Sequence, residues 1–146
     1  MPDWNSPVLI ELKDFIEQYI TALNEADFDI LSTCFAPKAV LHRGMKNYVG
    51  RDLIISWYET QLPPGNLKFE LVDASAGILP DSSAKCILWF EIIVEHNDKV
   101  KKDIHIEAID LEKHCGHWVI KTCFGLGYDP EYHKKYFGKF TQNFGD

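Results

Sequence analysis

The sequence lacks any apolar run near the roughly 20 residues needed to cross a bilayer, and acidic residues at Asp3 and Glu11 do not suit a secretory signal. It also lacks a basic cluster: 15 lysines and arginines stand against 22 aspartates and glutamates, and the formal net charge is −7. This balance does not favour binding to nucleic acid or to an anionic membrane. We therefore expect a cytoplasmic protein with an uncharged or cationic partner.

Motifs for disulfides, metals and cofactors are missing as well. The four cysteines show no C-x-x-C spacing, and Cys34, Cys86 and Cys123 lie in apolar runs, where a reduced thiol behaves as a small hydrophobic group. Residues 114–117 (HCGH) offer three possible zinc ligands, but a structural zinc site needs four that converge. A polar hairpin turn is the favoured interpretation. With no phosphate loop, dinucleotide fingerprint or nucleophile elbow either, we predict no metal and no cofactor.

The length of 146 residues fits one domain, residues 1–146, with no linker or repeat. Apolar residues at three- and four-residue steps over 9–23 predict a helix that buries Tyr19, with Ser6 and Pro7 as its cap and first residue. Asp27 can cap a second helix that reaches residue 36 and is stopped by Pro37. A strand at 39–43 and a third helix over 53–62 follow.

The second half predicts strands at 67–75, 84–96, 100–112 and 117–126, and the short joins after residue 96 and after residue 112 favour antiparallel neighbours. Helices followed by a meander indicate the α+β class. Residues 84–96 are apolar on both faces and must be covered twice. We expect a strongly curved sheet that closes over the helices, with a homodimer formed on its outer face.

Polar residues interrupt these strands at Glu91, His105 and Glu107, whose neighbours on the same strand face are apolar. General acid–base catalysis needs a pKa near the working pH, and burial raises the pKa of a carboxyl group toward that range. These side chains are therefore the candidate proton carriers.

The order of helix, helix, strand, helix and meander resembles the nuclear transport factor 2-like (cystatin-like) superfamily over residues 8–127. The residues that carry the resemblance are QYITALNEADFD at 18–29, Val49-Gly50-Arg51 and the closing HWVI at 117–120. Within the superfamily the chain is most similar to SnoaL-like proteins, ketosteroid isomerase, polyketide cyclases, dehydratases and fungal terpenoid isomerases. The resemblance implies a cone-shaped, curved antiparallel sheet wrapped around three N-terminal helices.

Site residues also follow from this resemblance. Tyr19 falls where ketosteroid isomerase keeps its oxyanion-hole tyrosine, and Glu107 matches its protonated oxyanion-hole carboxylic acid. Arg43 stands where the isomerase has its carboxylate base. Because a guanidinium cannot accept a proton at neutral pH, Arg43 is expected to orient a carbonyl, enolate or carboxylate.

The resulting hypothesis is a cofactor-independent isomerase, cyclase or dehydratase for a hydrophobic, oxygenated small molecule such as a polycyclic terpenoid or polyketide of secondary metabolism. Tyr19 and Arg43 would stabilise negative charge, Glu91 or Glu107 would move the proton, and His105 has either this role or a structural one. The expected aromatic wall for the substrate comprises Trp57, Tyr58, Trp89, Phe124 and Tyr128.

Several alternatives stay open at this point. Tyr19 can be an ordinary core tyrosine, and Arg43 with a glutamate can be a buried ion pair without chemistry. The domain can equally be a non-catalytic module that binds a protein, a lipid or another ligand. The aromatic tail at 129–146 either packs on the outer wall or caps the mouth of the cone as a lid, which we favour.

Overall fold

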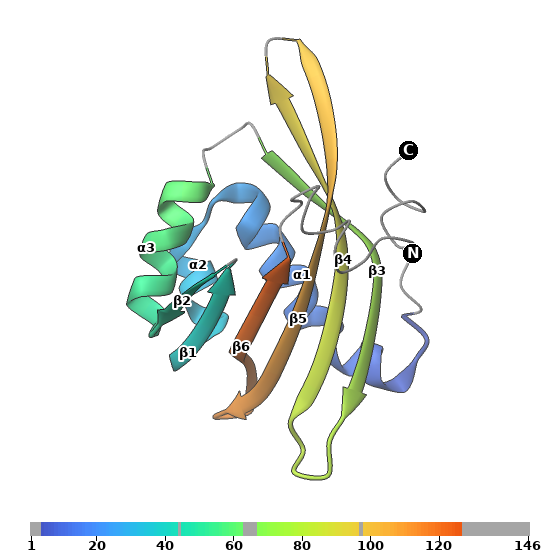
Figure 1. Cartoon of the computed structure of the whole chain (residues 1–146). Coiled ribbons are helices and arrows are strands. Elements are labelled where there is room, and N and C mark those ends of the chain that lie inside the picture. Colours follow the sequence, from blue (N-terminus) through green and yellow to red (C-terminus); the bar gives the residue numbers. More distant parts are fainter. Residues whose placement is uncertain (1–3, 44, 63–66, 97, 127–146) are drawn as a thin grey trace.

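A computed structural model describes residues 4–43, 45–62, 67–96 and 98–126 (Figure 1). The predicted tail at 129–146 and Tyr128 lie outside this range. The elements are α1 (Pro7–Glu25), α2 (Phe28–Thr33), β1 (Phe35–Arg43), β2 (Lys46–Val49), α3 (Arg51–Gln61), β3 (Leu67–Ile78), β4 (Ala84–His96), β5 (Lys99–His114) and β6 (His117–Leu126).

The strands form one curved sheet in the order β2-β1-β6-β5-β4-β3, with the helices on its concave side (Figure 1). The predicted α+β class with N-terminal helices is confirmed, as is the antiparallel meander from β3 to β6. The sheet is curved but not closed, because β2 and β3 are its two edges. One pair differs from the antiparallel prediction: β1 runs parallel to β6.

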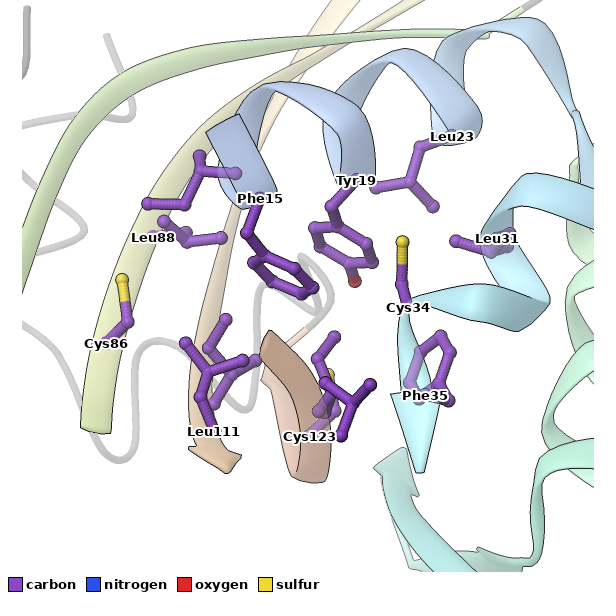
Figure 2. Close-up of a cluster of buried hydrophobic side chains, with 14 of the residues drawn as sticks. Phe15, Tyr19, Leu23, Leu31, Cys34, Phe35, Cys86, Leu88, Leu111 and Cys123 are labelled. Atoms are coloured by element: carbon purple, nitrogen blue, oxygen red, sulfur yellow. The ribbon is translucent and has the colours of Figure 1, made fainter. Parts of the chain in front are cut away.

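The core lies between α1 and the concave face of the sheet. Leu12, Ile16 and Tyr19 of α1 are fully buried, since they share the apolar stripe of the helix. They meet inward side chains of the strands, among them Leu88 and Leu111 (Figure 2). Each such large apolar side chain contributes about 1.5–3 kcal/mol when it is fully buried, so this layer fixes how α1 lies on the sheet.

The end of α2 was predicted wrongly. The helix stops at Thr33 rather than at residue 36, and Phe35 already belongs to β1. The carbonyl of Cys34 accepts a hydrogen bond of 2.7 Å from the Ile120 amide, and Phe35 pairs with Ile120 in β6. Pairing with a distant strand therefore replaces the last helical turn. Pro37 falls in the irregular stretch between the paired residues Phe35 and Val40, where its missing N–H breaks no regular ladder.

The remaining elements show where strand patterns are informative. β4 and β6 have the predicted bounds, while β3 and β5 extend a few residues beyond them. β2 was missed because it is short and largely exposed and shows no apolar alternation. Residues 114–117 form the predicted hairpin turn, in which Cys115 and Gly116 have positive φ angles of 52° and 82°. Among the helices described, none combines the length and apolar character required to span a membrane.

The cap of α2 gives a first testable prediction. The Asp27 side chain accepts a hydrogen bond of 3.1 Å from the Ile30 amide, so we expect Asp27→Ala to lower the free energy of unfolding by about 0.5–2 kcal/mol. Asp27→Asn keeps an equivalent acceptor and should change it far less. Urea denaturation measures both, and equal losses in the two variants would contradict the capping role.

Candidate functional site

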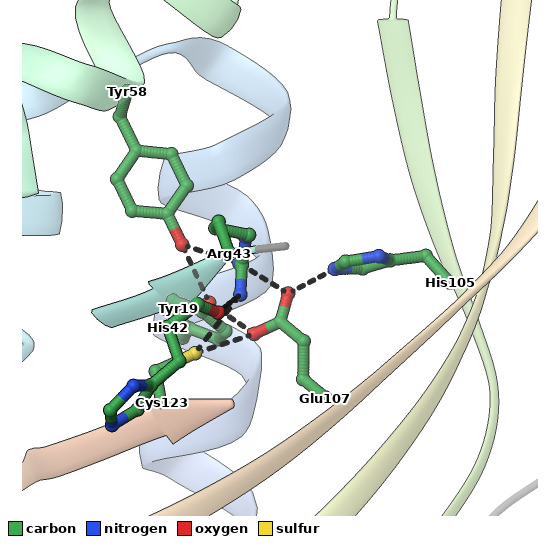
Figure 3. Close-up of polar contacts among 7 residues, drawn as sticks. All are labelled: Tyr19, His42, Arg43, Tyr58, His105, Glu107 and Cys123. Atoms are coloured by element: carbon green, nitrogen blue, oxygen red, sulfur yellow. Dashed lines mark hydrogen bonds and ion pairs between the residues drawn. The ribbon is translucent and has the colours of Figure 1, made fainter. Parts of the chain in front are cut away.

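Polar side chains from opposite ends of the sequence meet on the concave face (Figure 3). Arg43 of β1, Gly125 of β6 and Glu107 of β5 are cross-strand neighbours in one row of the sheet. Tyr19 comes down on this row from α1, and Tyr58 reaches it from α3. We call Tyr19, Arg43, Tyr58, His105, Glu107 and Cys123 the polar network.

Glu107 is the centre of the network and only 1% exposed. Its Oε1 accepts a 2.5 Å hydrogen bond from the Tyr19 hydroxyl and a 3.4 Å bond from the Cys123 thiol. Its Oε2 lies 2.9 Å from His105 Nε2 and 3.5 Å from Arg43 Nη2. Because a carboxylate only accepts hydrogen bonds, the geometry indicates that His105 Nε2 carries a proton.

The charge state of Glu107 differs from that implied by the resemblance. Burial by itself raises the pKa of Glu107, but the hydrogen bond from His105 and the charge of Arg43 outweigh it and hold this pKa at about 2. Glu107 is therefore an ionised carboxylate rather than a protonated acid. The expectation that burial moves its pKa toward neutrality is wrong, since the buried carboxylate is paired with Arg43 and accepts hydrogen bonds from Tyr19 and His105.

The hydroxyl and thiol groups of the network shift the other way. Burial raises the pKa of Tyr19 well above its ordinary value, and the charge of Glu107 adds to this effect. Burial likewise raises the pKa of Tyr58, against the opposing charge of Arg43, and that of the Cys123 thiol, where Glu107 again adds to the shift. These groups keep their protons and act as hydrogen-bond donors.

Arg43 links the network to the aromatic side chains of α3. Its Nη2 donates to the Tyr58 hydroxyl at 3.1 Å, and its guanidinium carbon lies 5.3 Å from the centre of the Trp57 ring. Its Nη1 also donates to the His42 carbonyl at 3.3 Å. The side chain is 11% exposed, compared with 1% for Glu107. Arg43 is thus the more accessible partner of this ion pair.

Gly125 makes this position of Arg43 possible. A Cβ atom at residue 125 would overlap Nη1 and Cζ of Arg43, because the guanidinium lies across the glycine between β1 and β5. Sequence reasoning missed both Gly125 and Cys123. They are successive inward-facing residues of β6. An inward glycine in an apolar strand is a recognised sign of close approach by another group.

Two predicted proton carriers are in the network and one is not. His105 and Glu107 lie side by side on the inward face of β5, as their alternation with Ile109 indicated. Glu91 lies on the opposite face of the sheet, because the buried residues of β4 around it are Leu88 and Phe90. Its carboxylate is 34% exposed and 3.8 Å from Lys102.

The predicted aromatic wall divides in the same way. Trp57 and Tyr58 lie beside Arg43, and Tyr58 belongs to the hydrogen-bonded network itself. Trp89 and Phe124 lie on the outer face, since they alternate with the buried Leu88 and Cys123. Phe124 is 48% exposed and packs on His42 there. The homodimer expected on this face stays a prediction. Within the described ranges, no group of His, Cys, Asp and Glu side chains could hold a metal ion.

The ionisation of Glu107 can be measured directly. We expect its carboxyl carbon, followed by ¹³C NMR, to stay ionised until the pH falls to about 2, compared with an ordinary pKa of 4.5. The folded pKa is the lower one, so Glu107 stabilises the fold above pH 4.5 and this contribution is lost as the pH falls toward 2. Titration above pH 4.5 would show that Glu107 is instead the neutral acid.

The role of Gly125 leads to a separate prediction. Gly125→Ala should push the Arg43 guanidinium away from Glu107 and so raise the pKa of Glu107 in the same NMR titration. Gly77→Ala in β3 is the matched control, because a Cβ there meets nothing within 4 Å. An unchanged Glu107 pKa in Gly125→Ala would mean that Arg43 does not set it.

Comparisons with known proteins agree with this structure. Residues 16–79 match the SnoaL-like domain family, and a search among curated proteins found no match. Solved structures with the same fold include a nuclear transport factor 2-like protein with a cystatin-like fold from Novosphingobium aromaticivorans, with 13% identity and a TM-score of 0.70. The match covers 83% of this chain and 82% of that one.

Two further structures point to different uses of the fold. A protein from Shewanella frigidimarina provisionally described as a ketosteroid isomerase has 16% identity and a TM-score of 0.67, over 86% of this chain and 98% of that one. A domain from Xanthomonas campestris, provisionally described as a calcium/calmodulin-dependent protein kinase II association domain, has 18% identity and a TM-score of 0.73, over 86% and 91%. The SnoaL-like match covers residues 16–79, and the similarity to these solved structures shows that the chain has the nuclear transport factor 2-like (cystatin-like) fold.

Proposed function

We propose that the protein is a cofactor-independent enzyme that isomerises, cyclises or dehydrates a hydrophobic, oxygenated small molecule by proton transfer. The observation that supports this proposal is the buried, ionised Glu107 surrounded by protonated donors on an otherwise apolar face. Clusters of strongly shifted titratable groups are typical of catalytic sites. The SnoaL-like match and the relative provisionally described as a ketosteroid isomerase favour the same chemistry.

In this proposal Arg43 and Tyr58 bind the substrate oxygen. Both are donors, they are already in contact at 3.1 Å, and Arg43 is the more exposed end of its ion pair. Donors fixed in a site of low polarity stabilise negative charge that develops on a carbonyl or enolate oxygen without having to reorganise. Trp57 beside them supplies an apolar surface for the rest of the substrate.

The proton is carried by the pair of His105 and Glu107. A carboxylate with a pKa of about 2 is a weak base near neutral pH. It can instead orient the imidazole and stabilise the imidazolium that forms when His105 accepts a proton, as carboxylates do in other catalytic pairs. Tyr19 holds the other oxygen of Glu107 in place. Glu91 has no part in this mechanism. Terpenoid and polyketide ketones fit the proposed substrate class.

The competing function is a non-catalytic binding module, in which the network is only structural. The Arg43–Glu107 pair supports this alternative, because a buried ion pair can be fully explained by mutual satisfaction of two charges. The relative provisionally described as an association domain shows the same fold. The two functions differ in whether the protein can move a proton on carbon.

A general carbon acid distinguishes them without knowledge of the natural substrate. We expect the protein to catalyse deuterium incorporation next to the carbonyl of 2-tetralone in D₂O, followed by ¹H NMR. Glu107→Gln and His105→Gln should each slow this exchange by roughly 100-fold or more, since proton transfer contributes about that much in enzymes. Arg43→Met should raise KM or lower kcat through loss of the oxygen contact.

Glu91→Gln is the matched control, because it removes the same charge from the outer face and should exchange at the wild-type rate. Circular dichroism checks that each variant is folded. A folded wild-type protein that exchanges no faster than buffer, or folded Glu107 and His105 variants that exchange at the wild-type rate, would contradict the enzymatic proposal and support the binding module.

A further inference from the structure

A pocket lies apart from the polar network, between α1, the end of α2, the start of α3 and the β5–β6 hairpin. Its volume is about 510 Å³, within the range of small-molecule sites, which is roughly 300–1,000 Å³. Phe15, Trp118 and Val119 form its apolar lining, and Phe15 and Val119 are themselves buried. The Phe15 ring also stacks on the ring of Tyr19, a member of the polar network, with 6.2 Å between the ring centroids.

Arg51 supplies a fixed cation to this pocket. Its Nε and Nη2 both donate to the Phe35 carbonyl, at 3.0 Å and 2.8 Å, so the plane of the guanidinium is held in place. Nη1 has no hydrogen-bond partner among the described residues. A guanidinium that is already ordered loses little conformational entropy when it binds an anion.

The remaining polar lining also favours an anion. Gln18, Ser32 and His117 line the pocket with donor groups that have no side-chain hydrogen bond within the described part of the chain. His114, which also lines the pocket, is already paired with Glu112 at 2.9 Å. Lys113 is not part of the lining and is paired with Glu11 at 3.3 Å. None of the described residues that line the pocket is acidic, although the chain as a whole has a net charge of −7.

We propose that this pocket binds a small aromatic carboxylate, with its ring against Trp118 and Phe15 and its carboxylate on Arg51. Gln18 and His117 supply further donors to the same carboxylate. The proposal does not depend on the proposed catalytic function, since none of these residues belongs to the polar network.

The probe for this proposal is 2-naphthoate, titrated into the ¹⁵N-labelled full chain and followed by NMR. We expect a Kd below about 1 mM, with the largest shifts at the Trp118 indole and at His117. The neutral 2-naphthoic amide has the same ring system and should bind at least tenfold more weakly, because it cannot form a charge-assisted bond with Arg51.

Variants test the assignment of the pocket. Arg51→Gln should weaken 2-naphthoate binding at least tenfold. Lys46→Gln removes an equal charge from a β2 residue that does not line the pocket, and it should not change the affinity. If loss of the Phe35 contacts unfolds Arg51→Gln, Ser32→Asp leaves those contacts intact and should weaken binding by placing a carboxylate at the rim.

Three results would overturn the proposal. These are equal affinity for the carboxylate and the amide, unchanged affinity in both the folded Arg51→Gln and Ser32→Asp variants, and shifts centred on the Trp57 indole instead of that of Trp118. The last result would place the anion at the polar network, and it would leave the deuterium-exchange test of the catalytic proposal unaffected.

Discussion

A carboxylate removed from water has to find its hydrogen-bond donors within the protein, and in this molecule Glu107 imposes that requirement on most of the fold. Transfer of a single ion to a protein interior costs several kcal/mol, even after relaxation. Tyr19, His105 and Arg43 offset this cost only if α1, β5 and β1 are all in place. Tyr19 and Glu107 are 88 residues apart in sequence, so the contact that satisfies the charge also fastens the helical layer to the sheet.

The same requirement explains the irregular features of the first strand. Arg43 reaches Glu107 only because β1 runs parallel to β6 and because residue 125 has no side chain in its path. That pairing begins at Phe35 and Ile120. Because Phe35 is already part of the strand, α2 ends at Thr33, before its predicted last turn. Arg51 then binds the Phe35 carbonyl from the start of α3. The local departures from helix and strand propensity thus all serve to place β1.

The two candidate sites use charge in opposite ways. In the polar network the central anion, Glu107, is surrounded by hydrogen-bond donors. Its ion pair with Arg43 neutralises part of the Arg43 charge. In the pocket at the β5–β6 hairpin an ordered cation is bound to a backbone carbonyl, which leaves its full charge for a ligand. The fold itself carries no preference between them, because sites are built on a shared scaffold by individual side chains.

The sequence by itself determined the helices, the meander and the faces of β5, because periods of 3.6 and 2 are set by local geometry and by which side is buried. It therefore placed His105 and Glu107 together, and the resemblance added Tyr19 and Arg43. Only the tertiary structure decided the parallel partner of β1, the end of α2 and the roles of Tyr58, Gly125 and Cys123. It also reversed the expected ionisation of Glu107. Each of these depends on contacts between residues distant in sequence, whose energies no local pattern records.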